Sequence, residues 1–325
     1  MSRAVAEANT NIALVKYWGK RPGPLNLPAV GSLSLTLAGL STRTEVRFDK
    51  DLDQDRLVLN GEVESGRALE KVSTFLDLIR QPAGVALRAE VRSANNFPTA
   101  AGLASSASAF AALALAATRA AGVTLDGRAL SILARQGSGS AARSIFGGLV
   151  RMHKGERPDG TDSFAEPLDA ADWGVRLVVG VTSEAKKATL STDGMNLTAR
   201  TSPFFAPWLT ANVEDLALAE AAIRVRDLDA LGVVTEQSAM TMHASAMAAR
   251  PAVVYMKGAT LDGFHAVQAM RKEGVRAYFT CDAGPHIKAL TDAATADEVA
   301  RRLAAVPGVL RTIVCAPGPD ARVVE

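Results

Sequence analysis

The chain has 325 residues, of which 48% are hydrophobic and 22% are charged, and its formal net charge is +2. This composition excludes a mainly disordered chain, and the length is sufficient for two layered domains that share a cleft. Because 36 basic residues are balanced by 34 acidic ones, the overall charge gives little support for binding nucleic acid or a membrane surface. We expect a small partner that is recognised locally.

The two cysteines, Cys281 and Cys315, and the four histidines show neither metal-ligand spacing nor a disulfide framework. This pattern fits a reducing compartment, and the N-terminus lacks a basic region followed by an apolar core, so we expect a cytoplasmic protein. The most apolar helical stretch, Ala109–Ala117, is far shorter than the roughly 18 residues that a membrane span needs. We therefore expect no membrane segment.

Periodicity predicts a mixture of strands and helices in both halves of the chain. Alternation with period two predicts two strands, 32–37 and 44–48, separated by a turn. The patterns that follow predict a segment at 56–61 ending in an Asn-Gly turn, a helix at 68–79, a strand at 84–92, helices at 106–121 and 126–136, strands at 147–153 and 173–181, helices at 213–224 and 228–247, a strand at 277–281 and a helix at 296–305. We predict an α+β fold whose two domains cover residues 1–185 and 186–325.

A loop of small residues precedes the Ala-rich helix, and the whole segment spans 95–108. Gly102 permits close approach of a ligand to the backbone, Ser105 and Ser106 offer hydroxyls, and the helix directs free N–H groups at the loop. The alternative is that these serines only cap the helix. A double serine behind a Pro-x-x-x-Gly-Leu turn favours a phosphate site, and the absence of a Gly-Lys-Ser/Thr triplet argues against an ordinary P-loop.

A second Gly/Ser loop spans 137–144. Its spacing fits a relaxed dinucleotide fingerprint, but that fingerprint follows a strand, and here the preceding residues have a helical pattern. Interpreted as a turn that opens a short helix, the loop places Ser140 and Arg143 on one face, which suits a phosphate or carboxylate. The alternative for Arg143 is a surface cation paired with an acid.

Two further segments carry chemical groups. In the segment 11–20, Lys16 and Lys20 are suited to phosphate oxygens and Tyr17 adds a hydroxyl, unless this is a solvated strand end. Asp282 ends a strand before a Gly-Pro turn, where it is either an Asx-turn or cap, or a carboxylate that orients or deprotonates a hydroxyl.

Six passages in order give these segments a common context: NIALVKYWGK, LNLP, NNFPTAAGLASSASAFAAL, GSGSAARSIFGG, STDGMNLT and DAGP, spread over 11–285. Together they resemble the GHMP kinase superfamily, and most closely its diphosphomevalonate decarboxylase branch. The resemblance implies an N-terminal domain like ribosomal protein S5 domain 2, a ferredoxin-like C-terminal domain, and an active site between them. It also implies ATP and Mg²⁺ as cofactors, mevalonate 5-diphosphate as substrate, and a homodimer.

The resemblance further implies roles for individual residues. The ATP phosphates would lie against Pro98, Ala101, Gly102, Leu103, Ala104, Ser105 and Ser106, with Ser105 and Ser106 also near the magnesium ion that ATP carries. The substrate would be held by Tyr17, Lys20, Ser138, Gly139, Ser140 and Arg143. The catalytic group would comprise Asp282 at the C3 hydroxyl, Arg143 and Asn11 at the carboxylate, Lys16 near negative charge, and Ser191 facing the phosphoryl group.

Two alternatives remain open on the sequence. Relatives of the same fold phosphorylate mevalonate at the 3-hydroxyl or decarboxylate the monophosphate, and a protein that kept the fold without catalysis would only bind nucleotide. Three positions depart from the family pattern: Asn9 replaces Pro, Gly31 replaces Asn, and His286 replaces an Asn that often follows Asp-Ala-Gly-Pro. We expect the first two to alter loop rigidity, and His286, beside Asp282, to change either the local charge or a detail of the substrate.

Overall fold

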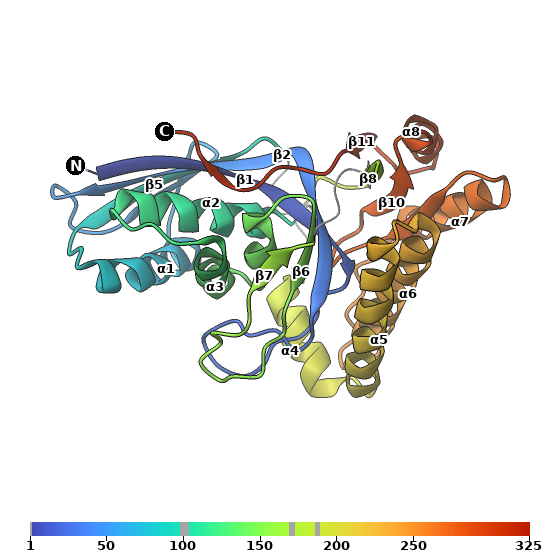
Figure 1. Cartoon of the computed structure of the whole chain (residues 1–325), viewed down its shortest axis with the longest axis horizontal. Helices are drawn as coiled ribbons and strands as arrows, with labels where there is room; N and C mark the ends of the chain where they lie inside the picture. Colours follow the sequence, from blue (N-terminus) through green and yellow to red (C-terminus); the bar gives the residue numbers. More distant parts are fainter. Residues whose placement is uncertain (1, 98–103, 169–172, 186–188) are drawn as a thin grey trace.

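Two antiparallel-rich sheets, each covered by helices, form the two halves of the molecule (Figure 1). The computed structural model describes residues 2–97, 104–168, 173–185 and 189–325. No helix in these described ranges is long and apolar enough to cross a membrane.

The first sheet is built on two long strands. Its order is β12-β1-β2-β5-β3-β4, and β6 pairs with β2 and with β7. Its strands are β1 (Ser2–Val15), β2 (Ser32–Asp49), β3 (Arg56–Leu59), β4 (Glu62–Glu64), β5 (Arg88–Asn95), β6 (Leu149–Met152), β7 (Ala165–Pro167) and β12 (Arg322–Val323). The predicted Asn-Gly turn joins β3 to β4, and Asn60 and Gly61 both adopt positive φ.

Strand β2 is continuous where the sequence predicts two strands and a turn, so that prediction is wrong. The chain absorbs the interruption as an irregularity: Asn9 pairs with Ser41 whereas Asn11 pairs with Thr36. Gly39, with φ of +83°, lies within the extra residues of β2. On either side of this point β2 has different second neighbours, β6 and β5. The long strand therefore carries the first sheet toward the second half of the molecule (Figure 1).

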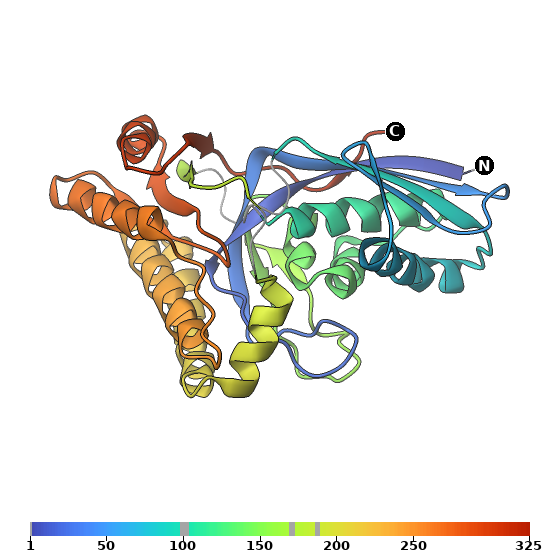
Figure 2. The same ribbon diagram turned by 180° about the vertical axis from the view of Figure 1, so that it is seen from behind.

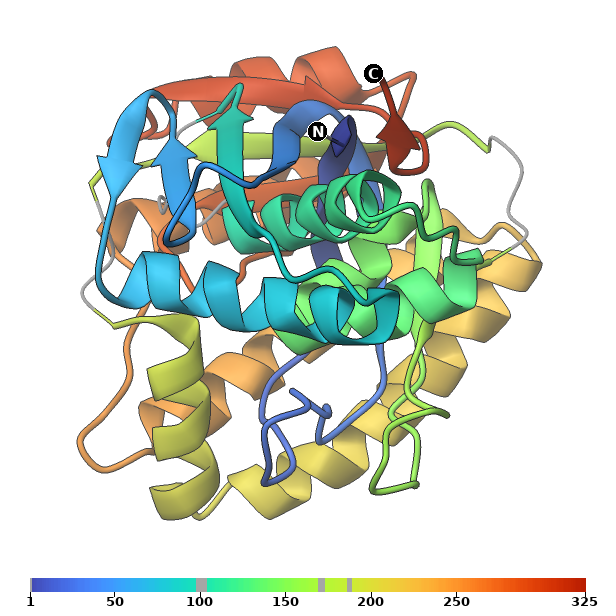
Figure 3. The same ribbon diagram turned by 90° about the vertical axis from the view of Figure 1, so that its left-hand side faces the viewer.

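Three helices cover one face of the first sheet, as Figures 1 and 3 show: α1 (Arg67–Ala83), α2 (Ser105–Ala120) and α3 (Gly127–Gly137). The predicted helices at 68–79, 106–121 and 126–136 are thus confirmed. Helix α2 packs closely because its buried positions are mostly alanine. A Cβ at Gly137 would lie 2.1 Å from the Phe110 ring, so this position requires glycine. The 3₁₀ helix η1 (Gly139–Ile145) follows directly, where a short helix is predicted.

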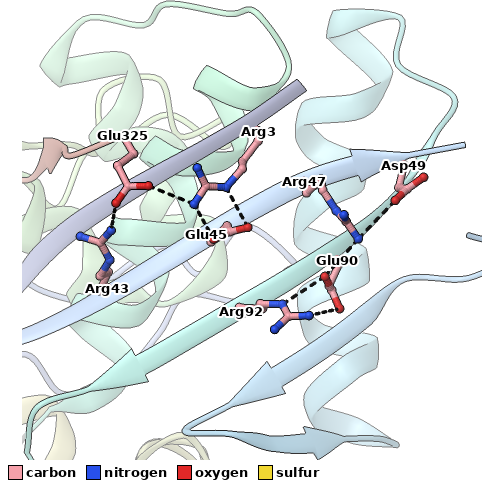
Figure 4. A network of polar contacts seen from close by, with 8 residues as sticks. All are labelled: Arg3, Arg43, Glu45, Arg47, Asp49, Glu90, Arg92 and Glu325. Carbon is pink, nitrogen blue, oxygen red and sulfur yellow. Dashed lines mark hydrogen bonds and ion pairs between the residues drawn. The ribbon is translucent and has the colours of Figure 1, made fainter. Parts of the chain in front are cut away.

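The opposite face of the first sheet is charged near the chain termini (Figure 4). Arg3 pairs with Glu45 on β2 and with Glu325, and Arg43 also pairs with Glu325. These groups are substantially exposed, so each pair contributes little stability. The residues of this network lie on the side of β2 that faces solvent, and the residues between them face the helices. Polar and apolar residues therefore alternate along this strand.

The second sheet has the order β11-β8-β10-β9 and is antiparallel throughout. Its strands are β8 (Val175–Val181), β9 (Ala277–Thr280), β10 (Ile287–Asp292) and β11 (Arg311–Cys315). The helices of this half are α4 (Ser191–Thr201), α5 (Phe205–Arg224), α6 (Leu228–Met247), α7 (Gly258–Lys272) and α8 (Ala296–Ala304). Helices α4 and α7 and strands β10 and β11 are absent from the predictions because their patterns are short or weakly periodic.

One hydrophobic cluster joins the two sheets. It contains Ile12 and Leu35 from the first sheet, Leu177 from the second, and Leu231 from α6. Strand β8 precedes residue 185 but belongs to the second sheet, and β12 follows it but belongs to the first. The division of the chain at residue 185 therefore stays a prediction.

A buried ion pair anchors α1 beneath the edge of the first sheet. Arg80 donates to both carboxylate oxygens of Asp55, at 2.7 and 2.9 Å, and Asp55 also accepts from the backbone of Ala89. Burial raises the pKa of Asp55, but the hydrogen bonds from Arg80 and Ala89 outweigh it, so the pKa lies below its usual value. The stability contributed by this carboxylate is therefore present above the unfolded pKa, about 3.9, and is lost as pH falls through the folded value.

We predict that Asp55→Asn destabilises the fold by about 1–3 kcal/mol at pH 7, because Arg80 loses its buried counter-charge and keeps only the half-exposed Asp77 as an acidic partner. Urea unfolding measures the effect, and the exposed neighbour supplies the control variant Asp53→Asn. The difference in unfolding free energy between the wild type and Asp55→Asn should decrease below pH 4. An equal effect of both substitutions at pH 7 would contradict the assignment.

Candidate active site

The buried ion pair between Lys16 and Asp282 connects the two halves of the molecule. Lys16 follows the end of β1, and its Nζ donates to Asp282 Oδ1 at 2.7 Å and to the Ala13 carbonyl at 2.6 Å. Helices α5 and α6 fix the same residue, because Asn212 donates to the Lys16 carbonyl and the Lys16 N–H donates to Ser238 Oγ. The end of β1 is thus held by elements of the second half.

The electrostatics favour an ionised Asp282. Burial raises the pKa of this carboxyl, but the charges of Lys16 and Lys288 outweigh burial and hold the pKa well below its ordinary value. Lys288 Nζ on β10 lies 3.3 Å from Asp282 Oδ2. Among the described residues the Asp282 side chain contacts two lysines, and the alternative that it forms an Asx-turn or cap does not hold.

Arg143 is buried and faces Asn11 rather than solvent. Its Nη1 donates to Ser32 Oγ at 2.7 Å and its Nε to Asn11 Oδ1 at 3.3 Å. Asn11 in turn donates to the Ser140 carbonyl and to Ser144 Oγ, at 3.0 and 2.7 Å. Burial lowers the pKa of Arg143 to about 10, which still leaves it charged at neutral pH. The surface-cation alternative is therefore wrong, because the contacts described for Arg143 include no acid.

The two Gly/Ser loops meet. Ser138 Oγ lies 3.4 Å from Ser106 Oγ, at the start of α2, and 3.3 Å from Ser140 Oγ. Tyr17 lies against the second loop: a Cβ at Gly139 would lie 2.1 Å from the Tyr17 hydroxyl oxygen. Burial raises the pKa of Tyr17 to about 12, so its hydroxyl stays protonated as a donor. Residues predicted for ATP and for substrate thus lie side by side.

Lys20 and the start of α4 form the far end of this region. Lys20 Nζ donates to Asn26 Oδ1 at 2.7 Å and to Thr192 Oγ1 at 3.4 Å, and Ser191 is the first residue of α4. A cavity of about 510 Å³ opens here, lined by Lys20, Arg21, Pro22, Gly23, Asn26, Thr192, Asn196, Ala199 and Arg200. Figure 2 shows α4 beside the loop that follows β1. The lining includes three basic side chains and no carboxylate.

The N-terminus of α2 differs from a helix capped by serine. Its N-cap is Ala104, in the left-handed region at φ 54°, and no side-chain cap bond forms there within the described residues. Ser105 and Ser106 therefore lie inside the first turn rather than at the cap. Four predicted ATP-contacting residues lie outside the described residues: Pro98, Ala101, Gly102 and Leu103.

The three departures from the family pattern have separate structural settings. Asn9 donates to the Pro319 carbonyl at 3.4 Å, and Gly31 lies so close to Leu216 that a Cβ would approach within 2.6 Å. His286 Nδ1 accepts from the Thr182 N–H at 3.2 Å. This hydrogen bond, with that from Thr182 Oγ1 to the Pro285 carbonyl, holds the loop between β9 and β10. The expected effect of His286 on local charge or on substrate detail stays a prediction.

Sequence reasoning missed several residues that complete the site. Ser32 and Ser144 hold Arg143 and Asn11, Asn212 holds the backbone at Lys16, and Lys288 contacts Asp282. Ser32 and Lys288 each occupy a strand position and carry no motif of their own. Only the pairing of strands distant in sequence brings them to the site.

Comparisons with known proteins agree with this arrangement. Residues 8–165 match the diphosphomevalonate decarboxylase-like N-terminal domain, and residues 177–312 match the mevalonate 5-diphosphate decarboxylase C-terminal domain. A diphosphomevalonate decarboxylase of Ganoderma lucidum is 38% identical over 307 residues, which cover 87% of this chain and 77% of the relative.

Solved structures cover the whole chain. The mevalonate diphosphate decarboxylase of Staphylococcus aureus superposes with a TM-score of 0.95 at 39% identity, covering 100% of this chain and 98% of that one. A second structure, a complex with MVAPP, AMPPCP and magnesium, has a TM-score of 0.93 at 38% identity, covering 100% and 99%. The α+β architecture is that of a GHMP kinase fold, and the chain belongs to the diphosphomevalonate decarboxylase family.

Proposed function

We propose that this protein catalyses the ATP-dependent decarboxylation of mevalonate 5-diphosphate to isopentenyl diphosphate, with release of ADP, phosphate and carbon dioxide. The observation that carries the proposal is the buried Lys16–Asp282 pair, which places an ionised carboxylate between the two sheets. The fully buried Arg143 and the paired Gly/Ser loops belong to the same half of the site as Lys16. Family membership supports the same reaction.

The reaction explains why one carboxylate is combined with several cations. A tertiary hydroxyl is a poor leaving group, so the γ-phosphoryl group of ATP is transferred to the C3 oxygen while its bond to ADP breaks. The hydroxyl proton passes to an oxygen of the transferred phosphoryl group and later leaves with the phosphate. The C3–O bond then breaks and phosphate leaves with the bonding electrons. The electrons of the bond between C2 and the carboxyl carbon become the new double bond, and carbon dioxide departs.

Each proposed role follows from the surroundings of the side chain. Asp282 accepts a hydrogen bond from the C3 hydroxyl and orients it toward the phosphoryl donor, while Lys16 stabilises developing negative charge. Arg143 and Asn11 hold the substrate carboxylate in line for bond cleavage, because a buried guanidinium orients an anion without giving up its proton. Ser191, at the start of α4, faces the reacting phosphoryl group.

The described residues fit magnesium that arrives on ATP. They contain no group of three or more His, Cys, Asp or Glu side chains that could hold a metal. Mg²⁺ commonly keeps several waters and binds substrate phosphates with few protein ligands. Ser105 and Ser106 would supply hydroxyls beside the ATP phosphates, where the metal would neutralise charge on the transferred group.

The substrate class is proposed from the far end of the site. Donors for a terminal diphosphate come from Lys20, Tyr17, Ser138 and Ser140. The adjoining cavity is lined by three basic side chains and no carboxylate. This favours the diphosphate over mevalonate and its monophosphate. A protein that only binds nucleotide would not require the buried Asp282 and Arg143.

We also propose a homodimer in the cytoplasm. Large apolar side chains are exposed on the neighbouring helices α5 and α6: Val213, Leu218, Val233, Met240 and Met247. Such exposure is typical of an interaction surface. The two cysteines are free and buried, which suits a reducing compartment. Sedimentation at several protein concentrations tests the dimer.

The reaction is tested by incubating the protein with ATP and, separately, mevalonate, its 5-phosphate and its 5-diphosphate. We expect carbon dioxide and phosphate release in equal amounts from the diphosphate alone. Phosphate transfer without carbon dioxide would indicate a 3-kinase, and carbon dioxide from the monophosphate alone would contradict the substrate assignment.

We predict that Asp282→Asn retains binding of ATP and substrate but lowers kcat by about a thousandfold or more, because the amide keeps the shape and loses the charge. Carbon dioxide release assays and calorimetric binding measure both effects, and thermal unfolding checks that the variant is folded, because Lys16 and Lys288 lose their common counter-charge. The exposed residue Asp262 provides the control variant Asp262→Asn, which should be neutral. Near-normal turnover of Asp282→Asn would remove this residue from the mechanism.

We predict that Gly139→Ala raises the KM for mevalonate 5-diphosphate about tenfold or more, with a smaller change in the KM for ATP. The added Cβ displaces the buried Tyr17 hydroxyl and with it the second loop. Gly258→Ala is the matched control, since its Cβ meets nothing within 4 Å. If the KM values for mevalonate 5-diphosphate and for ATP change equally, the second loop does not belong specifically to the substrate subsite, and the assignment is wrong.

A further inference from the structure

Lys288 occupies a buried position on β10, where an apolar residue is usual. Its side chain is 1% exposed. It lies opposite Val179 on β8 and Thr280 on β9, and residues opposite each other in an antiparallel pair share a face. Leu290, two residues along the same strand, packs in the cluster that joins the two sheets. A lysine here places a charged side chain on a buried face of the strand, between Val179 and Thr280.

The ammonium of Lys288 has Asp282 as its counter-ion, at 3.3 Å from Oδ2. Asp282 Oδ1 is already paired with Lys16, whose Nζ lies at 2.7 Å and is itself buried. Two buried lysines therefore share one carboxylate, and with both protonated the three side chains together carry one excess positive charge. Burial, opposed by Asp282, lowers the pKa of Lys16. Burial of an uncompensated charge is costly, so one lysine would suffice if the carboxylate only needed neutralisation.

An anion delivered during turnover would complete this arrangement. The transferred phosphoryl group arrives at the hydroxyl that Asp282 orients, and an excess of positive charge that is already in place needs no reorganisation to stabilise it. The site would then be electrostatically balanced only when the phosphoryl group is present.

We propose that Lys288 is a positioning residue for the reaction: it holds the second oxygen of the Asp282 carboxylate and supplies the excess positive charge that the transferred phosphoryl group meets. This inference rests on the proposed function. It assigns Lys288 no contact with the substrate, because its side chain is 1% exposed and pairs with the Asp282 carboxylate.

Other titratable groups also surround Asp282. Lys16 comes from the end of β1, Arg143 from η1, and the neighbouring Cys281 contacts His243 on α6 at 3.0 Å. Burial lowers the pKa of His243 to about 4 and raises that of Cys281 to about 12, so both are neutral near pH 7. Removal of Lys288 leaves Lys16 as the lysine paired with Asp282, against a burial effect that raises the pKa of the carboxyl.

The test compares Lys288→Met, which keeps the length and removes the charge, with Lys288→Arg, which keeps the charge. Lys272→Met on the exposed surface of α7 is the matched control, and thermal unfolding monitors the fold of each variant. In Lys288→Met we expect kcat to fall about a hundredfold, the KM for mevalonate 5-diphosphate to change less than threefold, and the acidic limb of the kcat profile to move to higher pH. Lys288→Arg should restore part of kcat and the wild-type limb.

A second measurement does not depend on turnover. With ¹³C-carboxyl aspartate, the Asp282 signal, identified by its loss in Asp282→Asn, should titrate at higher pH in Lys288→Met than in the wild type. An unchanged titration, or a loss of kcat with an unmoved pH profile, would overturn the inference. Absence of carbon dioxide release by the wild-type protein would instead overturn the proposed function, and the carboxyl titration would still decide the role of Lys288.

Discussion

The structure depends on the need to pair the buried charge of Lys16. This ammonium lies at the end of the first long strand, 2% exposed, and its counter-ion Asp282 belongs to the second sheet. Neither group is stable in isolation within the core, so folding each half separately leaves a buried charge that only the other half can compensate. The shared hydrophobic cluster brings the sheets together, and the ion pair fixes their relative position at the reacting group.

The same constraint explains the uneven distribution of charge. The outer face of the first sheet carries exposed pairs such as Arg3 with Glu45, which contribute little. Inside the site, basic groups outnumber acids, and Arg143 is buried without an acid among its described contacts. The excess positive charge of the site is neutralised only when anions bind. These anions are supplied by ATP and by a substrate that carries phosphates and a carboxylate.

Sequence patterns predicted the long amphipathic helices and the chemical loops, because both depend on residues close together in the chain. They failed at β2, where an irregularity at Gly39 allows one strand to change neighbours, and at β10, whose short apolar pattern gives no periodic signal. Lys288 was missed for the same reason. Its role depends on the pairing of β10 with β8 and β9, and pairing partners are set by tertiary structure.

The low pKa of Asp282 also bears on how the hydroxyl is activated. A carboxylate held by two ammonium groups is a weak base, so it is poorly suited to remove the C3 proton before phosphoryl transfer begins. Phosphoryl transfer passes through a loose transition state in which the attacking oxygen needs alignment more than prior deprotonation. An ionised carboxylate that is hydrogen-bonded to Lys16 through Oδ1 and ion-paired with Lys288 through Oδ2 provides that alignment. The lysines that weaken Asp282 as a base are therefore the groups that make it an effective orienting residue, and they stabilise the charge of the incoming phosphoryl group at the same time.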